Sequence, residues 1–152
     1  MASDLEILLI RLAVLSEIPD LWQLVQAYSD EIDPAGQKPQ ERATKRTLMA
    51  LIAHPTSVVL VRDQNGSVQG LLAGSIGSSP WADTRIADYL IFYLSPACRG
   101  GRAALSMLHA YEQWAASMGA EVVGVSDTGS QLGRLLKRQG YQPAEQKFLR
   151  CL

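Results

Sequence analysis

The chain has 152 residues, which is enough for one domain with a single hydrophobic core. Hydrophobic residues make up 47% of it and charged residues 19%. This composition excludes an intrinsically disordered chain, because such chains bury too little apolar surface to offset the entropy lost on ordering. The net charge of −1 gives no reason to expect binding to nucleic acid or to a membrane.

The charges are unevenly distributed along the chain. Residues 1–96 carry seven Lys and Arg against eleven Asp and Glu, whereas residues 97–152 carry seven against four. A polyanionic ligand is therefore expected in the second part of the chain.

Cysteine content and the longest apolar runs exclude several classes of protein. Cys98 and Cys151 cannot form a disulfide framework, and with the two histidines we do not expect them to fill a structural zinc site without several carboxylates, so no metal is expected. The acidic start is unlike a signal peptide, and no apolar run approaches the roughly 18–20 residues of a membrane span. We expect a soluble, cytoplasmic protein.

Hydrophobic periodicity predicts elements in the order β-α-α-β-β-β-α-β-α-β. Ser16 is the expected N-cap of the first helix, and Asn65-Gly66 predicts a tight hairpin between two strands. The expected strands are 5–14, 57–62, 68–76, 85–95 and 121–125, with one or two more in 141–152. The expected helices are 16–30, 39–53, 102–118 and 130–139. Helices packed on a mixed sheet, an α/β (α+β) class, follow from this order.

The most informative segment joins the strand at 85–95 to the helix at 102–118. It reads Arg99-Gly100-Gly101-Arg102-Ala103-Ala104 after a strand that Pro96 ends. The first amides of a helix have no intrahelical partners, and small residues let a phosphate approach them. This pattern favours an anion site, and a strand corner that uses glycine for its turn is the alternative. Neither a P-loop motif nor a Rossmann fingerprint is present.

Four segments together resemble the GNAT family of acetyl-CoA-dependent N-acetyltransferases over almost the whole chain. They are Ile10–Ala13, Ile18–Leu24, Ser95–Leu105 and Gly140-Tyr141. In that family the segment matching residues 99–104 is the pyrophosphate loop, written [QR]-x-x-G-x-[GA]. Its R-G-G-R-A-A form here resembles phage-type members.

The resemblance implies one GNAT-like domain over residues 1–152. Its sheet would be mixed and mostly antiparallel, with about 6–7 twisted strands flanked by about 4 helices. It also implies acetyl-CoA as cosubstrate and no metal. The residues expected to bind acetyl-CoA are Phe92, Leu94, Arg99, Gly100, Gly101, Arg102, Ala103, Ala104 and Lys137.

Arg102 departs from the family pattern, which prefers glycine at this position. A left-handed backbone there would cost an arginine on the order of 1 kcal/mol. With an ordinary backbone, Arg102 is free to contact phosphate.

The resemblance further implies direct acetylation of a primary amine on a small molecule, a lysine or a protein N-terminus. The Leu94 N–H would hold the thioester oxygen, and Asp88 is the candidate base, with an ion-paired residue at the strand's start as the alternative. Tyr89 and Tyr93 are expected to be packing aromatics on the face opposite Asp88. The acidic first half suits a cationic acceptor.

Two family residues are missing from this sequence. Leu136 stands where a tyrosine often protonates the departing thiolate, and Gly129 stands where an asparagine is usual. An alternative is therefore a weak or inactive GNAT-like module that binds and modulates a protein partner. A longer-chain acyl donor is a further option, and a homodimer is possible.

Overall fold

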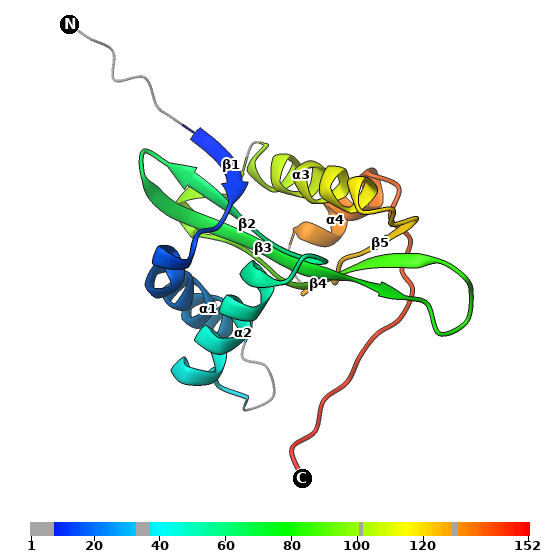
Figure 1. Cartoon of the computed structure of the whole chain (residues 1–152), viewed down its shortest axis with the longest axis horizontal. Helices are drawn as coiled ribbons and strands as arrows, with labels where there is room; N and C mark the ends of the chain where they lie inside the picture. The colour runs from blue at the N-terminus through cyan, green and yellow to red at the C-terminus, as the bar shows by residue number, and fades with distance from the viewer. Residues whose placement is uncertain (1–7, 33–36, 101, 129–130) are drawn as a thin grey trace, which may run out of the picture.

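A computed structural model describes residues 8–32, 37–100, 102–128 and 131–152. One five-stranded sheet runs through the molecule, with α1 and α2 on one face and α3 and α4 on the other (Figure 1). The strands are β1 (Leu8–Leu12), β2 (Ser57–Gln64), β3 (Ser67–Ser78), β4 (Arg85–Leu94) and β5 (Val122–Gly124). The helices are α1 (Ile18–Ile32), α2 (Glu41–Ala53), α3 (Ala103–Ser117) and α4 (Leu132–Arg138). None of the helices in the described ranges is long and apolar enough to span a bilayer.

The strands lie side by side in chain order, β1-β2-β3-β4-β5. The first four pair antiparallel, and β5 pairs parallel to β4 after the crossover through α3. The expected hairpin is confirmed: Asn65 and Gly66 have φ of 53° and 81°, as a two-residue primed turn requires. Asp63 Oδ1 accepts the Gly66 N–H at 2.8 Å and closes the turn.

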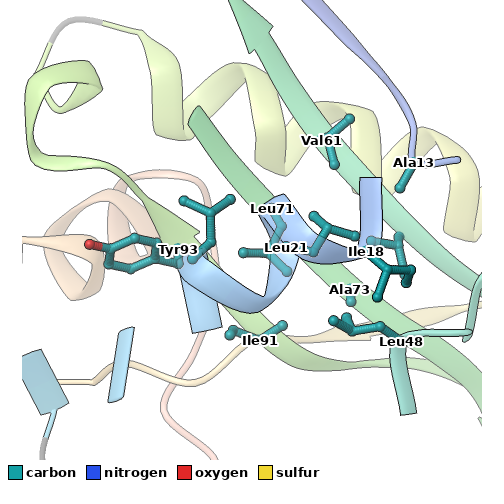
Figure 2. Close-up of a cluster of buried hydrophobic side chains, with 11 residues drawn as sticks. Ala13, Ile18, Leu21, Leu48, Val61, Leu71, Ala73, Ile91 and Tyr93 are labelled. Atoms are coloured by element: carbon teal, nitrogen blue, oxygen red, sulfur yellow. The ribbon is translucent and has the colours of Figure 1, made fainter. Parts of the chain in front are cut away.

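Each face of the sheet has its own apolar core. Figure 2 shows side chains from α1 and α2 meeting those of β2, β3 and β4, with Leu21 and Leu71 completely buried. On the other face Met107 and Tyr111 of α3 are also completely buried, against Leu72 and neighbouring strand residues. Strands covered on both faces read as nearly continuous apolar runs, which explains the composition of β4.

A β-bulge interrupts β4 at Leu90. Ala73 of β3 pairs with Ile91 while the adjacent Gly74 pairs with Tyr89, so Leu90 has no partner on β3. One extra residue reverses the alternation of side chains along the strand. The expected placement of Tyr93 opposite Asp88 is therefore wrong: Tyr93 packs in the α1/α2 core, on the face that Asp88 also occupies.

The expected terminal strands are absent from the described residues, where the sheet has five strands instead of 6–7. Residues 142–152 are extended and exposed, with Phe148 82% exposed (Figure 1). Residues 142–147 do not join the sheet because they are mostly polar and include Pro143. Proline has no backbone N–H to donate to a neighbouring strand. A strand there would bury too little apolar surface to offset its ordering.

Arg11 of β1 forms hydrogen bonds that connect β1 with the 3-10 turn after it and with the end of β2. Arg11 binds both oxygens of Glu17, at 2.8 and 2.7 Å, and its Nη2 donates to Asp63 at 2.9 Å. Glu17 also accepts the Val14 N–H at 2.9 Å, which opens a 3-10 turn at Leu15–Glu17. Glu17 therefore performs the capping expected of Ser16.

We predict that Glu17→Gln lowers the free energy of unfolding by about 1–2 kcal/mol at pH 7, because hydrogen bonds to charged groups are stronger than neutral ones. The Arg11 guanidinium lowers the pKa of Glu17 below its ordinary 4.5. A lowered folded-state pKa gives stability that is complete above the unfolded-state pKa and is lost as the pH falls below it. Urea unfolding at pH 7 and below pH 4.5 checks this.

Glu145→Gln in the exposed C-terminal segment is the matched control and should leave stability unchanged at both pH values. A Glu17→Gln variant with the same pH dependence as the parent chain would contradict the assignment.

Candidate functional site

The pairing between β4 and β5 is short. Only three residue pairs join them: Ile86–Val122, Ala87–Val123 and Asp88–Gly124. Beyond Asp88, β4 continues to Leu94, and β3 is its one strand neighbour among the described residues. The backbone of 89–94 that faces away from β3 therefore borders an open strand edge.

The hydrogen-bonding alternation shows which groups of β4 face this edge. The Ser95 N–H donates to the Gln69 carbonyl of β3 at 2.8 Å. In an antiparallel ladder the next residue points its N–H and C=O the other way, so those of Leu94 face away from β3. The Arg99 Nε donating to the Leu94 carbonyl at 2.9 Å agrees with this direction.

Phe92 shares the backbone direction of Leu94, and both side chains are buried in the core beneath α3. Phe92 and Leu94 therefore expose only backbone N–H and C=O groups at the open edge. These two predicted site residues of β4 are thus adjacent at this edge through their main chain.

Arg99 turns toward α1 instead of toward the start of α3. Its Nη2 lies 2.6 Å from Glu31 Oε1, and its guanidinium lies 5.3 Å from the centre of the Tyr93 ring. Tyr93 donates its hydroxyl to the same Glu31 oxygen. The Arg99 guanidinium lowers the pKa of Glu31, so this pair is charged at neutral pH. Arg99 thus ties the turn after β4 to the end of α1.

The turn itself leaves room for a ligand. Gly100 has φ of +94° and nothing within 4 Å of the place where a Cβ would stand. Arg102 is exposed with φ of −107°, so the backbone strain considered for it does not arise. Gly101 lies outside the described residues.

Within the described residues, the first turn of α3 has amides without a partner. The first intrahelical bond runs from the Ser106 N–H to the Arg102 carbonyl, at 2.9 Å. The amides of Ala103, Ala104 and Leu105 precede it and have no hydrogen-bond partner within the described ranges. Helix N-termini with small residues attract anions, and Arg102 adds a positive charge beside them.

Asp88 lies at the last β4–β5 pair, with its side chain exposed. Ala87 and Val123 pack beneath α3, so Asp88 and Gly124 face the α1/α2 side of the sheet. A Cβ on Gly124 would stand 2.9 Å from Asp88 Oδ1, so the carboxylate lies over this glycine. The salt bridges found among the described residues do not include Asp88, which disfavours the ion-paired alternative.

Leu136 is 5% exposed and offers no hydroxyl, and Gly129 lies outside the described residues. Lys137 is exposed on α4. The Tyr141 hydroxyl donates to Glu112 of α3 at 3.2 Å, placing the end of α4 roughly 14 Å along α3 from Ala103. The structure does not bring Lys137 into contact with the start of α3.

A cavity that the sequence did not reveal lies on the α1/α2 side of β4. Its volume is about 630 Å³, and its floor includes the bulge residue Leu90 and its neighbour Ile91. Its walls come from α1, from residues 37–40 and from the first half of α2. In the sequence, the polar residues 37–40 between two amphipathic helices were the feature that could have indicated this cavity. The bulge at Leu90, which forms part of its floor, has no recognisable sequence motif.

No family model matches the sequence, and no curated protein matches it. Solved structures match its fold over nearly its whole length. A GNAT family acetyltransferase of Staphylococcus aureus has 18% identity and a TM-score of 0.70, over 95% of this chain and 98% of that chain. A predicted acetyltransferase with acetyl-CoA from Clostridium acetobutylicum has 18% identity and a TM-score of 0.78, over 94% and 95%.

A third similar structure is the aminoglycoside N-acetyltransferase AAC(6')-Iy in complex with CoA. It has 12% identity and a TM-score of 0.77, over 100% of this chain and 99% of that chain. The chain therefore has the GNAT fold.

We predict that Gly100→Ala lowers the free energy of unfolding by about 1 kcal/mol, because a φ of +94° is strained for any residue with a Cβ. Gly77→Ala is the matched control, since Gly77 also has open space around it but no positive φ. Urea unfolding of both variants tests the prediction. Equal stability of the two variants would contradict it.

Proposed function

We propose that the chain is an acetyl-CoA-dependent N-acetyltransferase that moves an acetyl group directly to a primary amine. One observation carries the proposal: the first amides of α3, which have no partner among the described residues, adjoin a strand edge where β5 no longer pairs with β4. The first suits a diphosphate and the second suits an extended amide-containing arm. The GNAT fold of the chain supports the same reading.

Acetyl-CoA fits the residues that are present. The amides of Ala103 and Ala104 would bind the pyrophosphate together with the Arg102 guanidinium, and the open space at Gly100 leaves room for it. Arg99 would contribute by holding the turn through Glu31. Lys137 and Gly101, the latter outside the described residues, are the proposed partners of the other phosphate oxygens.

On β4, the main chain of Phe92 and Leu94 would pair with the pantetheine arm. Bound acetyl-CoA supplies an acetyl thioester at this edge. The Leu94 N–H would donate a hydrogen bond to the acyl oxygen, and a donor already fixed in a strand needs no reorganisation when negative charge develops there.

Asp88 would accept a proton from the incoming ammonium, directly or through a water molecule. Only the neutral amine attacks, and a free amine has a pKa of about 10, so a proton acceptor is needed near neutral pH. Asp88 shares the α1/α2 face with the cavity over Leu90, so an amine in that cavity would approach β4 from the side of this carboxylate.

The departing thiolate has no tyrosine beside it in this proposal, because Leu136 is buried and apolar. A thiol with a pKa of about 8.5 is a tolerable leaving group at neutral pH, so water suffices to protonate it.

We predict that acetyl-CoA raises the melting temperature of the protein, because a ligand that binds only the folded state stabilises it by mass action. Arg102→Glu should weaken CoA binding about tenfold or more, since a carboxylate replaces a guanidinium beside the phosphates. Calorimetric titration with CoA measures this. Arg42→Glu makes the same charge change on α2, across the sheet, and should bind CoA like the parent chain.

An absent melting shift together with flat calorimetry would overturn the assignment. An unchanged dissociation constant in Arg102→Glu would place this arginine away from the phosphates.

We predict that Asp88→Asn lowers kcat/KM about 10²- to 10⁴-fold near neutral pH while leaving CoA affinity unchanged. The deficit should shrink as the pH approaches the pKa of the amine, because an already neutral amine needs no base. Asp83→Asn in the loop before β4 is the matched control. A deficit that stays constant with pH would assign Asp88 a structural role.

Turnover across a panel of amines and lysine peptides separates the proposed enzyme from a GNAT-like module that modulates a protein partner. A module would bind CoA without releasing CoA thiol above the buffer rate. Acetyl-CoA compared with longer acyl-CoAs in the same assay determines the acyl preference.

A further inference from the structure

The cavity over Leu90 carries information about the acceptor, and the inference drawn from it rests on the proposed function. Its lining divides into two parts. Val25, Leu48, Leu90 and Ile91 form an apolar part against β4, where the amine must meet the acyl group. Hydroxyls, amides and one ammonium form the polar part around residues 37–44.

Ser29 contributes a hydroxyl to this wall. It lies on α1 with only 8% of its surface exposed, and it lines the cavity. Its hydroxyl has no hydrogen-bond partner in the part of the chain that the structure describes. This oxygen is not among the buried side-chain atoms of the described residues that lack a partner, so it is accessible from the cavity and available to a polar ligand.

The start of α2 faces the same space. Gln40, Ala43 and Thr44 line the cavity, and the first intrahelical bond of α2 runs from the Thr44 N–H to the Gln40 carbonyl at 2.9 Å. Gln40 is the N-cap residue but makes no side-chain capping bond, so the amides of the first turn have no side-chain cap from this residue. The positive end of the helix dipole favours negative charge there.

Lys38 adds a full positive charge to this wall, and the salt bridges among the described residues do not involve it. Among the described residues, those that line the cavity include no carboxylate, and two nearby in sequence are paired: Glu41 with Lys45 at 2.8 Å and Glu31 with Arg99 at 2.6 Å. Burial, followed by the nearby Tyr89 hydroxyl, raises the pKa of the lining residue Tyr28 to about 12, so its hydroxyl stays protonated and neutral.

We propose that the acceptor is a small primary amine that carries an anionic group, a carboxylate or a phosphate. Lys38, the Ser29 and Thr44 hydroxyls and the first amides of α2 bind the anionic group, and the apolar part directs the amine toward β4. This reverses the expectation of a cationic acceptor, which followed from the summed charge of residues 1–96. The charge of the groups that line the cavity determines which charge the acceptor carries, because surface charges elsewhere are screened by solvent.

Matched pairs of amines test the proposal, with release of CoA thiol as the readout. One pair is O-phosphoethanolamine and ethanolamine, and the other is phenylalanine and phenylalaninamide; spermidine represents a polycation. The anionic member of at least one pair should have a kcat/KM about tenfold higher or more, as expected for charge-assisted hydrogen bonds. Equal rates within both pairs, or spermidine as the best substrate, would overturn the proposal while leaving the proposed acetyltransferase intact.

Two variants locate the effect in the cavity. Lys38→Met and Ser29→Ala should each raise KM for the preferred anionic amine severalfold or more, with kcat, CoA affinity and the KM of the neutral amine unchanged. Lys147→Met, in the exposed C-terminal segment, is the matched control. A merely structural role would move the KM of both members of a pair together, and that result would contradict the proposal.

Binding without turnover keeps the two proposals distinguishable. Calorimetric titration of the CoA-loaded protein with O-phosphoethanolamine and with ethanolamine requires no chemistry. Binding of the phosphorylated amine alone, lost in Lys38→Met, would support the anion site even if no amine were acetylated. Absence of any difference between the two amines would overturn the anion site whatever the enzyme activity.

Discussion

The short pairing of β5 with β4 is the constraint on which the site depends. The two strands are joined by three residue pairs and separate after Asp88–Gly124, although β4 continues to Leu94. A strand that loses a neighbour within a sheet retains backbone groups that must find other partners or remain open to a ligand. The Leu94 carbonyl is bound by Arg99, whereas its N–H stays directed at the open edge. Within the described residues, β4 thus has no strand neighbour along residues 89–94 on the side away from β3.

The bulge at Leu90 connects this edge with the cavity on the other side of β4. The extra residue turns Ile91 and Tyr93 toward α1 and α2, and Leu90 and Ile91 then form the floor of the cavity. In the proposed function, the start of α3 and the open edge bind the thioester donor, while the cavity binds the amine acceptor. Both reach the same stretch of β4, so a single strand can hold the two reactants in position for direct transfer.

Local patterns predicted much of the fold. The Asn65-Gly66 turn and the apolar periodicity of the helices depend on neighbouring residues, and the structure agrees with them. The bulge at Leu90 depends on the register between β3 and β4, which no single segment encodes. The partner of Arg99 is Glu31, which lies 68 residues away in the sequence. The sequence could therefore suggest an arginine in the loop after β4, but not the ion pair that it forms.

Nitrogen-15 NMR titration of the protein with CoA tests the central claim most directly, because it observes the individual amides. We expect the signals of Leu94, Ala103 and Ala104 to shift on binding, while those of Val59 and Leu71, in strands with a neighbour on each side, stay in place. Binding of CoA that leaves the first three signals unchanged would contradict the account, as would the absence of any binding.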